Sequence, residues 1–87
     1  SQNYPNPFNS ETRFIHTLNK PDYVSLKIYN IMGELIHTVF EGNRGPGIHR
    51  DKWRGVDYEN QPVSSGVYFY NLNSGGKSIT KKMILSK

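Results

Sequence analysis

The chain has 87 residues, no cysteine and a formal net charge of +4 at neutral pH, which indicates one small domain and excludes disulfides and thiolate metal sites. No apolar run approaches the roughly 18 residues of a membrane span. The excess charge lies in residues 60–87, which hold four lysines and no acid, unlike the interleaved arginine and aromatic residues of a nucleic-acid-binding face, so we expect no nucleic-acid partner.

Residues 1–10 form the predicted lead-in to the domain. Within "NYPNPFN", Pro5 and Pro7 alternate with asparagines between Tyr4 and Phe8. Proline fixes φ and lacks an amide donor, so this pattern excludes a helix and disfavours a paired strand. We expect an extended, polyproline-like segment that connects an upstream domain to a folded domain over residues 11–87. The chain also begins without methionine, as a piece of a longer protein does.

Alternation of side chains with period two predicts four strands in the first part of the chain. The second of them is the clearest, because Val24, Leu26 and Ile28 are all directed to one face. The fourth ends at Trp53, the only tryptophan and the expected core anchor. Turn-forming residues separate these strands. The strands cover residues 11–18, 23–30, 34–41 and 48–53, and the turns are "NKPD", "NIMGE" and "GNRGPG".

The second part of the chain begins with its longest irregular stretch, residues 54–66. Two further strands follow, over residues 67–72 and 77–87, and "NSGG" between them is a hairpin loop. Six or seven short strands with no helical periodicity predict an all-β fold, a small antiparallel β-sandwich.

Histidines and acidic loop residues are the candidates for a metal site. His16, His37 and His49 lie on three predicted strands with no metal-ligand spacing, so we interpret them as half-buried strand residues. The loop at 54–66 offers hard oxygen ligands of the kind that calcium prefers, but the cation Arg54 opposes a second cation there. We therefore predict an ordinary turn whose polar side chains bind their own backbone. The acidic and amide side chains of this loop are Asp57, Glu59 and Asn60.

Catalytic motifs are absent from the sequence. We find no nucleophile elbow, phosphate loop or paired-carboxylate motif, and a domain of this size has little room for a deep pocket. We expect no enzymatic activity and no cofactor. The lysines of "KKMILSK" allow two interpretations, which are protection of an exposed sheet edge and recognition of a basic β-strand by another protein.

The order of several short motifs resembles a known family. In this order, the motifs are similar to the type A C-terminal sorting domain of the type IX secretion system of Bacteroidetes, over residues 4–87. They also resemble the immunoglobulin-like domain of flagellar hook-capping proteins, in which aspartate follows the tryptophan where this chain has Arg54. The motifs are "YPNPFN" at residues 4–9, "IYN" at 28–30 followed by Gly33, Trp53-x-Gly55, "SGVY" at 65–68, and Lys81-Lys82 followed by Ile84-Leu85.

The resemblance implies an immunoglobulin-like sandwich of six or seven strands that serves as a secretion signal for a larger cargo protein. The expected partners are the cargo domain upstream, the type IX machinery and a sortase-like peptidase, with outer-membrane association only through the machinery. The domain then passes through the periplasm to the cell surface or medium, and it is either cleaved or used for surface attachment. The implied recognition residues are Gly66, Tyr68, Lys81, Lys82, Ile84, Leu85 and Lys87, and those of the processing boundary are Tyr4, Pro5, Pro7 and Phe8.

Two other classes of function are compatible with a small surface sandwich. The first is carbohydrate binding, in which Tyr58, Tyr68 and Tyr70 supply stacking rings. The second is a passive spacer or dimerising module. The place of the domain in its parent protein distinguishes these from a sorting role.

Overall fold

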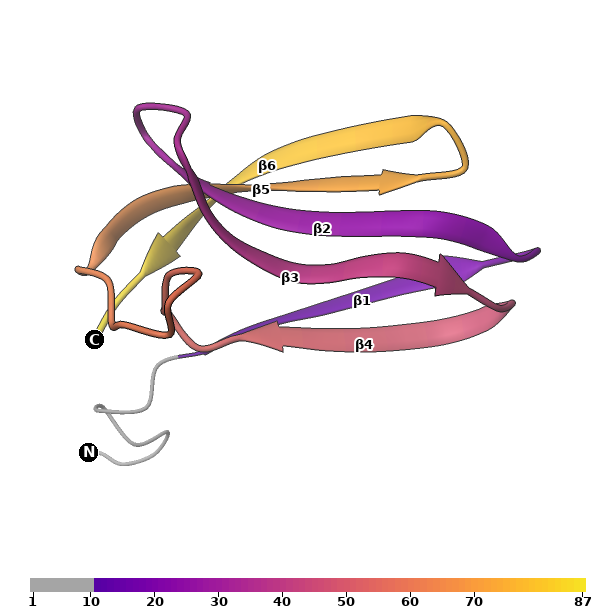
Figure 1. Ribbon diagram of the computed structural model, residues 1–87, viewed down its shortest axis with the longest axis horizontal. Helices are drawn as coiled ribbons and strands as arrows, with labels where there is room; N and C mark the ends of the chain where they lie inside the picture. Colours follow the sequence, from indigo (N-terminus) through magenta and orange to yellow (C-terminus); the bar gives the residue numbers. More distant parts are fainter. Residues whose placement is uncertain (1–10) are drawn as a thin grey trace.

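The computed structural model describes residues 11–87, which form six strands and contain no helix that could cross a membrane. The predicted lead-in, with Tyr4, Pro5, Pro7 and Phe8, lies outside the described residues. Figure 1 shows the strands in two layers. The strands are β1 (Thr12–Leu18), β2 (Asp22–Asn30), β3 (Leu35–Arg44), β4 (Gly47–Trp53), β5 (Gly66–Ser74) and β6 (Lys77–Leu85).

Two antiparallel sheets make up the fold. One sheet has the order β3-β2-β5-β6, and the other consists of β1 and β4. This arrangement confirms the predicted all-β, immunoglobulin-like sandwich. In Figure 1, β4 and β6 lie on opposite sides of the molecule.

Strand pairing extends beyond the bounds that the sequence predicts. β3 continues to Arg44, which pairs with Asp22, so most of the predicted loop at residues 42–47 is strand. Pairing to β2 stabilises this stretch although its glycines disfavour a strand. The predicted hairpin after β5 is confirmed, but its turn is shorter. Only Gly75 and Gly76 connect the strands, with φ values of 60° and 76°, as a tight type I′ turn requires.

β2 is the central strand of the core. The alternation of Val24, Leu26 and Ile28 is confirmed, since none of these side chains is more than 1% exposed. Trp53, 1% exposed, is the predicted anchor, and its ring meets that of Tyr68 edge to face at 5.3 Å. The indole Nε1 donates a hydrogen bond of 2.8 Å to the Val56 carbonyl oxygen, so the ring is buried with its polar group satisfied.

We predict that Trp53→Ala lowers the free energy of unfolding by about 3–5 kcal/mol, because a buried aromatic leaves a large cavity. Chemical denaturation followed by circular dichroism measures the change. Tyr58→Ala is the matched control, since this ring is 73% exposed and its loss should change stability by less than about 0.5 kcal/mol. Equal effects of the two substitutions would contradict the assignment of Trp53 as the anchor.

Candidate functional site

The terminal strand β6 lies at one edge of the four-stranded sheet. Among the described residues it pairs only with β5, and the register runs without a shift from the Ser74–Lys77 pair to the Gly66–Leu85 pair. Most of its side chains are exposed. The strand therefore offers a backbone edge without bulges, with lysines along it, which fits both protection of an edge and recognition by a partner.

The predicted recognition residues of β6 lie on two different faces of the sheet, because side chains alternate along a strand. Lys81 pairs with Tyr70, and Tyr70 pairs with the buried Ile28, so these residues share the inner face of the sheet. Lys82 and Ile84 alternate with them and occupy the outer face. Ile84 is 70% exposed. Two adjacent lysines thus belong to different surfaces.

Leu85 belongs to the core rather than to the surface. It is 2% exposed and clusters with Ile28, Trp53 and Tyr68. Its methyl groups lie against Gly55, where an added Cβ would stand 3.0 Å from Leu85 Cδ2. Gly55 also has a φ of +73°, which residues with a side chain rarely adopt. The Trp-x-Gly motif therefore makes room for the end of β6.

Lys87 and Tyr68 are held by hydrogen bonds to the loop between β4 and β5. Lys87 donates from Nζ to the Gly55 carbonyl oxygen at 3.1 Å, and from its backbone nitrogen to Ser65 Oγ at 3.0 Å. The Tyr68 hydroxyl donates to the Ser64 carbonyl oxygen at 2.7 Å. Tyr68 is 7% exposed, so its ring cannot stack on a sugar as the carbohydrate-binding interpretation requires. These contacts fix the terminal segment on the loop.

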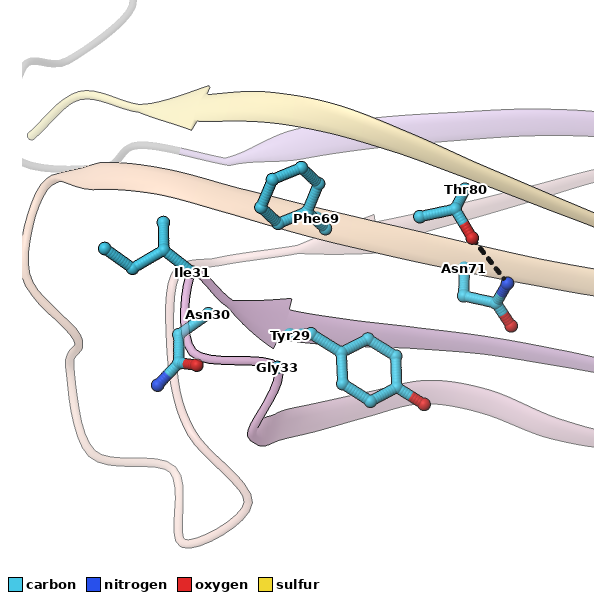
Figure 2. A pocket seen from close by; sticks show the side chains of 7 residues that line it. All are labelled: Tyr29, Asn30, Ile31, Gly33, Phe69, Asn71 and Thr80. Carbon is cyan, nitrogen blue, oxygen red and sulfur yellow. Dashed lines mark hydrogen bonds between the residues drawn. The ribbon is translucent and has the colours of Figure 1, made fainter.

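A hollow of about 450 Å³ lies on the outer face of the four-stranded sheet. Figure 2 shows the rings of Tyr29 and Phe69 on neighbouring strands, with Asn71 donating to Thr80 Oγ1 at 2.9 Å beside them. We call this feature the outer hollow. Sequence analysis missed it, although the period-two pattern already separates Tyr29 from Ile28. Its lining residues are Tyr29, Asn30, Ile31, Gly33, Phe69, Asn71 and Thr80.

The turn between β2 and β3 forms one end of the outer hollow. Asn30 Oδ1 accepts hydrogen bonds from the backbone nitrogens of Met32 at 2.9 Å and Glu34 at 3.0 Å, and Asn30 Nδ2 donates to Glu34 Oε1. The side-chain amide of Asn30 therefore satisfies the hydrogen-bonding groups of this turn. Ile31 and Met32 are left at its tip, 72% and 79% exposed.

The loop at residues 54–66 contains the turn that the sequence predicts. Asp57 Oδ1 accepts hydrogen bonds from the backbone nitrogens of Glu59 at 2.8 Å and Gln61 at 3.0 Å. Asn60 has a φ of 62°, which an asparagine tolerates in a tight turn. Within residues 11–87, no three His, Asp or Glu side chains are grouped to hold a metal ion.

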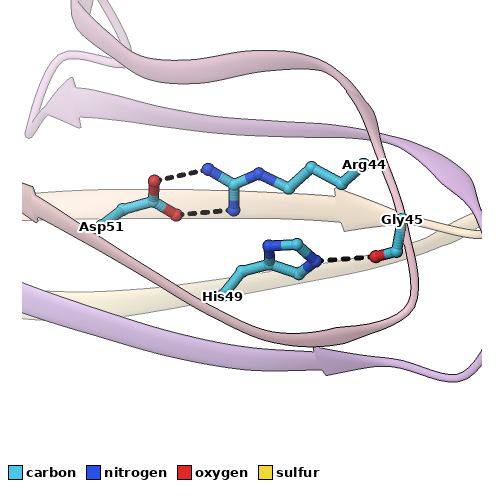
Figure 3. A network of polar contacts seen from close by, with 4 residues as sticks. All are labelled: Arg44, Gly45, His49 and Asp51. Atoms are coloured by element: carbon cyan, nitrogen blue, oxygen red, sulfur yellow. Dashed lines mark hydrogen bonds and ion pairs between the residues drawn. The ribbon is translucent and has the colours of Figure 1, made fainter.

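A polar network joins the two sheets (Figure 3). Arg44 on β3 donates two hydrogen bonds to the carboxylate of Asp51 on β4, at 2.9 and 2.6 Å, and both side chains are 11% exposed. The guanidinium lies 3.5 Å from the centre of the Phe40 ring. His49 Nε2 lies 2.7 Å from the Gly45 carbonyl oxygen and carries the hydrogen, because a carbonyl only accepts.

His16 lies beside this network on β1, opposite His49, with the ring centres 5.4 Å apart. Its Nε2 is buried without a hydrogen-bond partner among the described residues. Burial lowers the pKa of His16 below the ordinary value for histidine, and the charges of Arg44 and His49 lower this pKa further, while Asp51 opposes them. His37 lies apart from this pair, with Nδ1 3.0 Å from the Asp57 carbonyl oxygen.

We predict that calcium leaves the stability of the domain unchanged, because the carboxylate of Asp57 is already engaged by backbone donors. Thermal melts in millimolar calcium and in chelator should overlap. A ligand that binds the folded state raises its melting temperature by mass action. A rise of several degrees in calcium would therefore contradict this prediction.

We also predict that stability falls as the pH drops through the titration of histidine. With a lowered pKa in the fold, His16 binds a proton more readily in the unfolded chain, so acid favours unfolding. The loss should develop between about pH 7 and pH 5. Melting temperatures across this range, for the unsubstituted domain and for His16→Leu, measure it. The variant should lose part of the pH dependence, and an unchanged dependence would assign the effect to other groups.

The sequence of the chain matches the model of one protein family. It matches the model of the secretion system C-terminal sorting domain over residues 2–86. No curated protein and no solved structure matches it. The family match covers nearly every residue of the chain, including β6 and the loop on which its end is fixed. This protein therefore belongs to the family of C-terminal sorting domains of the type IX secretion system.

Proposed function

We propose that this domain is a non-catalytic label that directs an upstream cargo protein through the outer membrane by way of the type IX machinery. The family match over residues 2–86 is the observation that carries the proposal. The structure supports it with an exposed basic strand at a sheet edge, β6, held in a fixed position by the core. The expected path leads through the periplasm to the cell surface or medium.

The part of the domain that the machinery reads is β6 with the residues around its end. Its lysines, together with Lys87, carry the whole excess charge of the chain. Such a cluster steers an encounter with an acidic receptor surface. Gly66, Tyr68 and Leu85 support recognition from within, because they fix the strand, whereas Lys81, Lys82 and Ile84 are exposed to a partner.

Residues 1–10 supply the boundary between label and cargo. Pro5 and Pro7 stiffen the chain, and a stiff, extended connection keeps two domains apart. A sortase-like peptidase that cuts at or before "SQNYPNPFN" would find room there, with Tyr4 and Phe8 as side chains to recognise. The cargo is then released or attached to the surface.

We predict that residues 1–87, fused after a periplasmic reporter, bring the reporter to the cell surface or medium of a host with a type IX system. The reporter without the domain, and the fusion in a strain without the translocon, should stay in the periplasm. Fractionation with reporter activity measures the distribution. A fusion that stays in the periplasm of the competent host would identify the domain as a passive spacer.

Recognition of β6 needs a variant that keeps the core intact. Deletion of residues 82–87 removes the buried Leu85, so loss of export would also follow from unfolding. The double substitution Lys81→Gln and Lys82→Gln changes only exposed side chains. It should reduce export at an unchanged melting temperature. Undiminished export would show that the lysines only protect the sheet edge from unwanted pairing.

A further inference from the structure

We propose that the secretion machinery reads the outer face of the four-stranded sheet, with the outer hollow at its centre, rather than the edge of β6 alone. The partner segment that fits is an extended one with an apolar side chain next to a carboxylate. This inference rests on the proposed function and specifies the surface and the chemistry of its partner.

A row of side chains crosses the whole sheet at the outer hollow. Leu35 pairs with Tyr29, Tyr29 with Phe69, and Phe69 with Lys82, so one residue of each strand lies in line on the same face. The rings of Tyr29 and Phe69 are half-buried and line the hollow (Figure 2). The row therefore joins the aromatic floor directly to a lysine of β6.

Exposed aliphatic side chains continue this surface toward the end of β6. Ile31 and Ile84 are 72% and 70% exposed, and Val67, which pairs with Ile84, is 38% exposed. A second hollow of about 370 Å³ has Asn30 and Ile31 in common with the first and includes Val67. Single exposed apolar residues are ordinary, but a contiguous apolar patch marks an interaction surface.

The outer face carries several charged side chains, and a lysine is left among them without an acidic partner in the described part of the chain. Lys27 pairs with Glu41 at 3.8 Å, and the carboxylate of Glu34 accepts from Asn30. Lys82 has no carboxylate within ion-pair distance among residues 11–87. An apolar surface bordered by an unneutralised lysine is complementary to an apolar side chain beside an acid.

The distance between neighbouring side chains on the outer face matches the repeat of side chains in an extended ligand. Val67, Phe69 and Asn71 alternate along β5 on this face, about 7 Å apart, which is the repeat of alternate side chains in any β-strand. An extended partner lying along β5 thus places every second side chain on this surface. Asn71 and Thr80 already bond to each other, so the rings and aliphatic side chains remain as the contacts.

Two matched pairs of variants in the exported fusion test this inference. Lys52→Glu and Lys82→Glu make the same charge change at exposed positions, on β4 of the other sheet and on the outer face. Ile84→Ser and Ile15→Ser remove the same side chain at 70% and 67% exposure, on the outer face and on β1 of the other sheet. Lys82→Glu and Ile84→Ser should each reduce export by roughly tenfold, the loss typical of an interface hot spot.

Lys52→Glu and Ile15→Ser should be exported like the unsubstituted fusion, and melting temperatures of all four domains check that each is folded. Equal loss in Lys52→Glu and Lys82→Glu would overturn this inference, because net charge alone would then steer recognition, while the proposed function would stand. Normal export of Lys82→Glu and Ile84→Ser would overturn it as well. An unsubstituted fusion that is not exported would reject the proposed function itself.

Discussion

The contact between Leu85 and Gly55 determines how the terminal strand is placed, and with it which side chains the strand presents on each face. Gly55 has no Cβ and a left-handed backbone, which lets the end of β6 enter the core beside Trp53. Once Leu85 is inside, the period of a strand assigns every other side chain of β6 to a face. The position of Lys82 on the outer surface therefore follows from a packing contact three residues further along the chain.

Sequence patterns predicted the fold where apolar and polar residues alternate strictly, and were less successful where they do not. In β2 the alternation located the core. The glycine-rich residues 42–47 were assigned to a loop, because residues 42–44 are held in a strand by pairing with β2, and a local pattern does not reveal such a tertiary interaction. "KKMILSK" has no alternation, so the burial of Leu85 could not be seen. In "VYFYNL" apolar and aromatic residues occur at both odd and even positions, so the pattern did not show that Phe69 lies on the outer face.

Polar contacts between the sheets were beyond prediction as well. Arg44 and Asp51 are close in sequence, yet their bond depends on β3 and β4 belonging to different layers. A largely buried pair of this kind contributes little net stability, because both charges lose their hydration. Its effect is on specificity. A shift of either strand by one residue would leave a buried charge without its partner, so the pair holds one alignment of the two layers.

The last strand in chain order completes the core, and this order links folding to the completeness of the polypeptide. A chain that emerges amino end first can present β1 to β5, but Trp53 has no Leu85 beside it until β6 has followed. A protein broken off anywhere upstream lacks both the packed interior and the basic strand. Placement of β6 in its packed position therefore requires synthesis of the chain through residue 85.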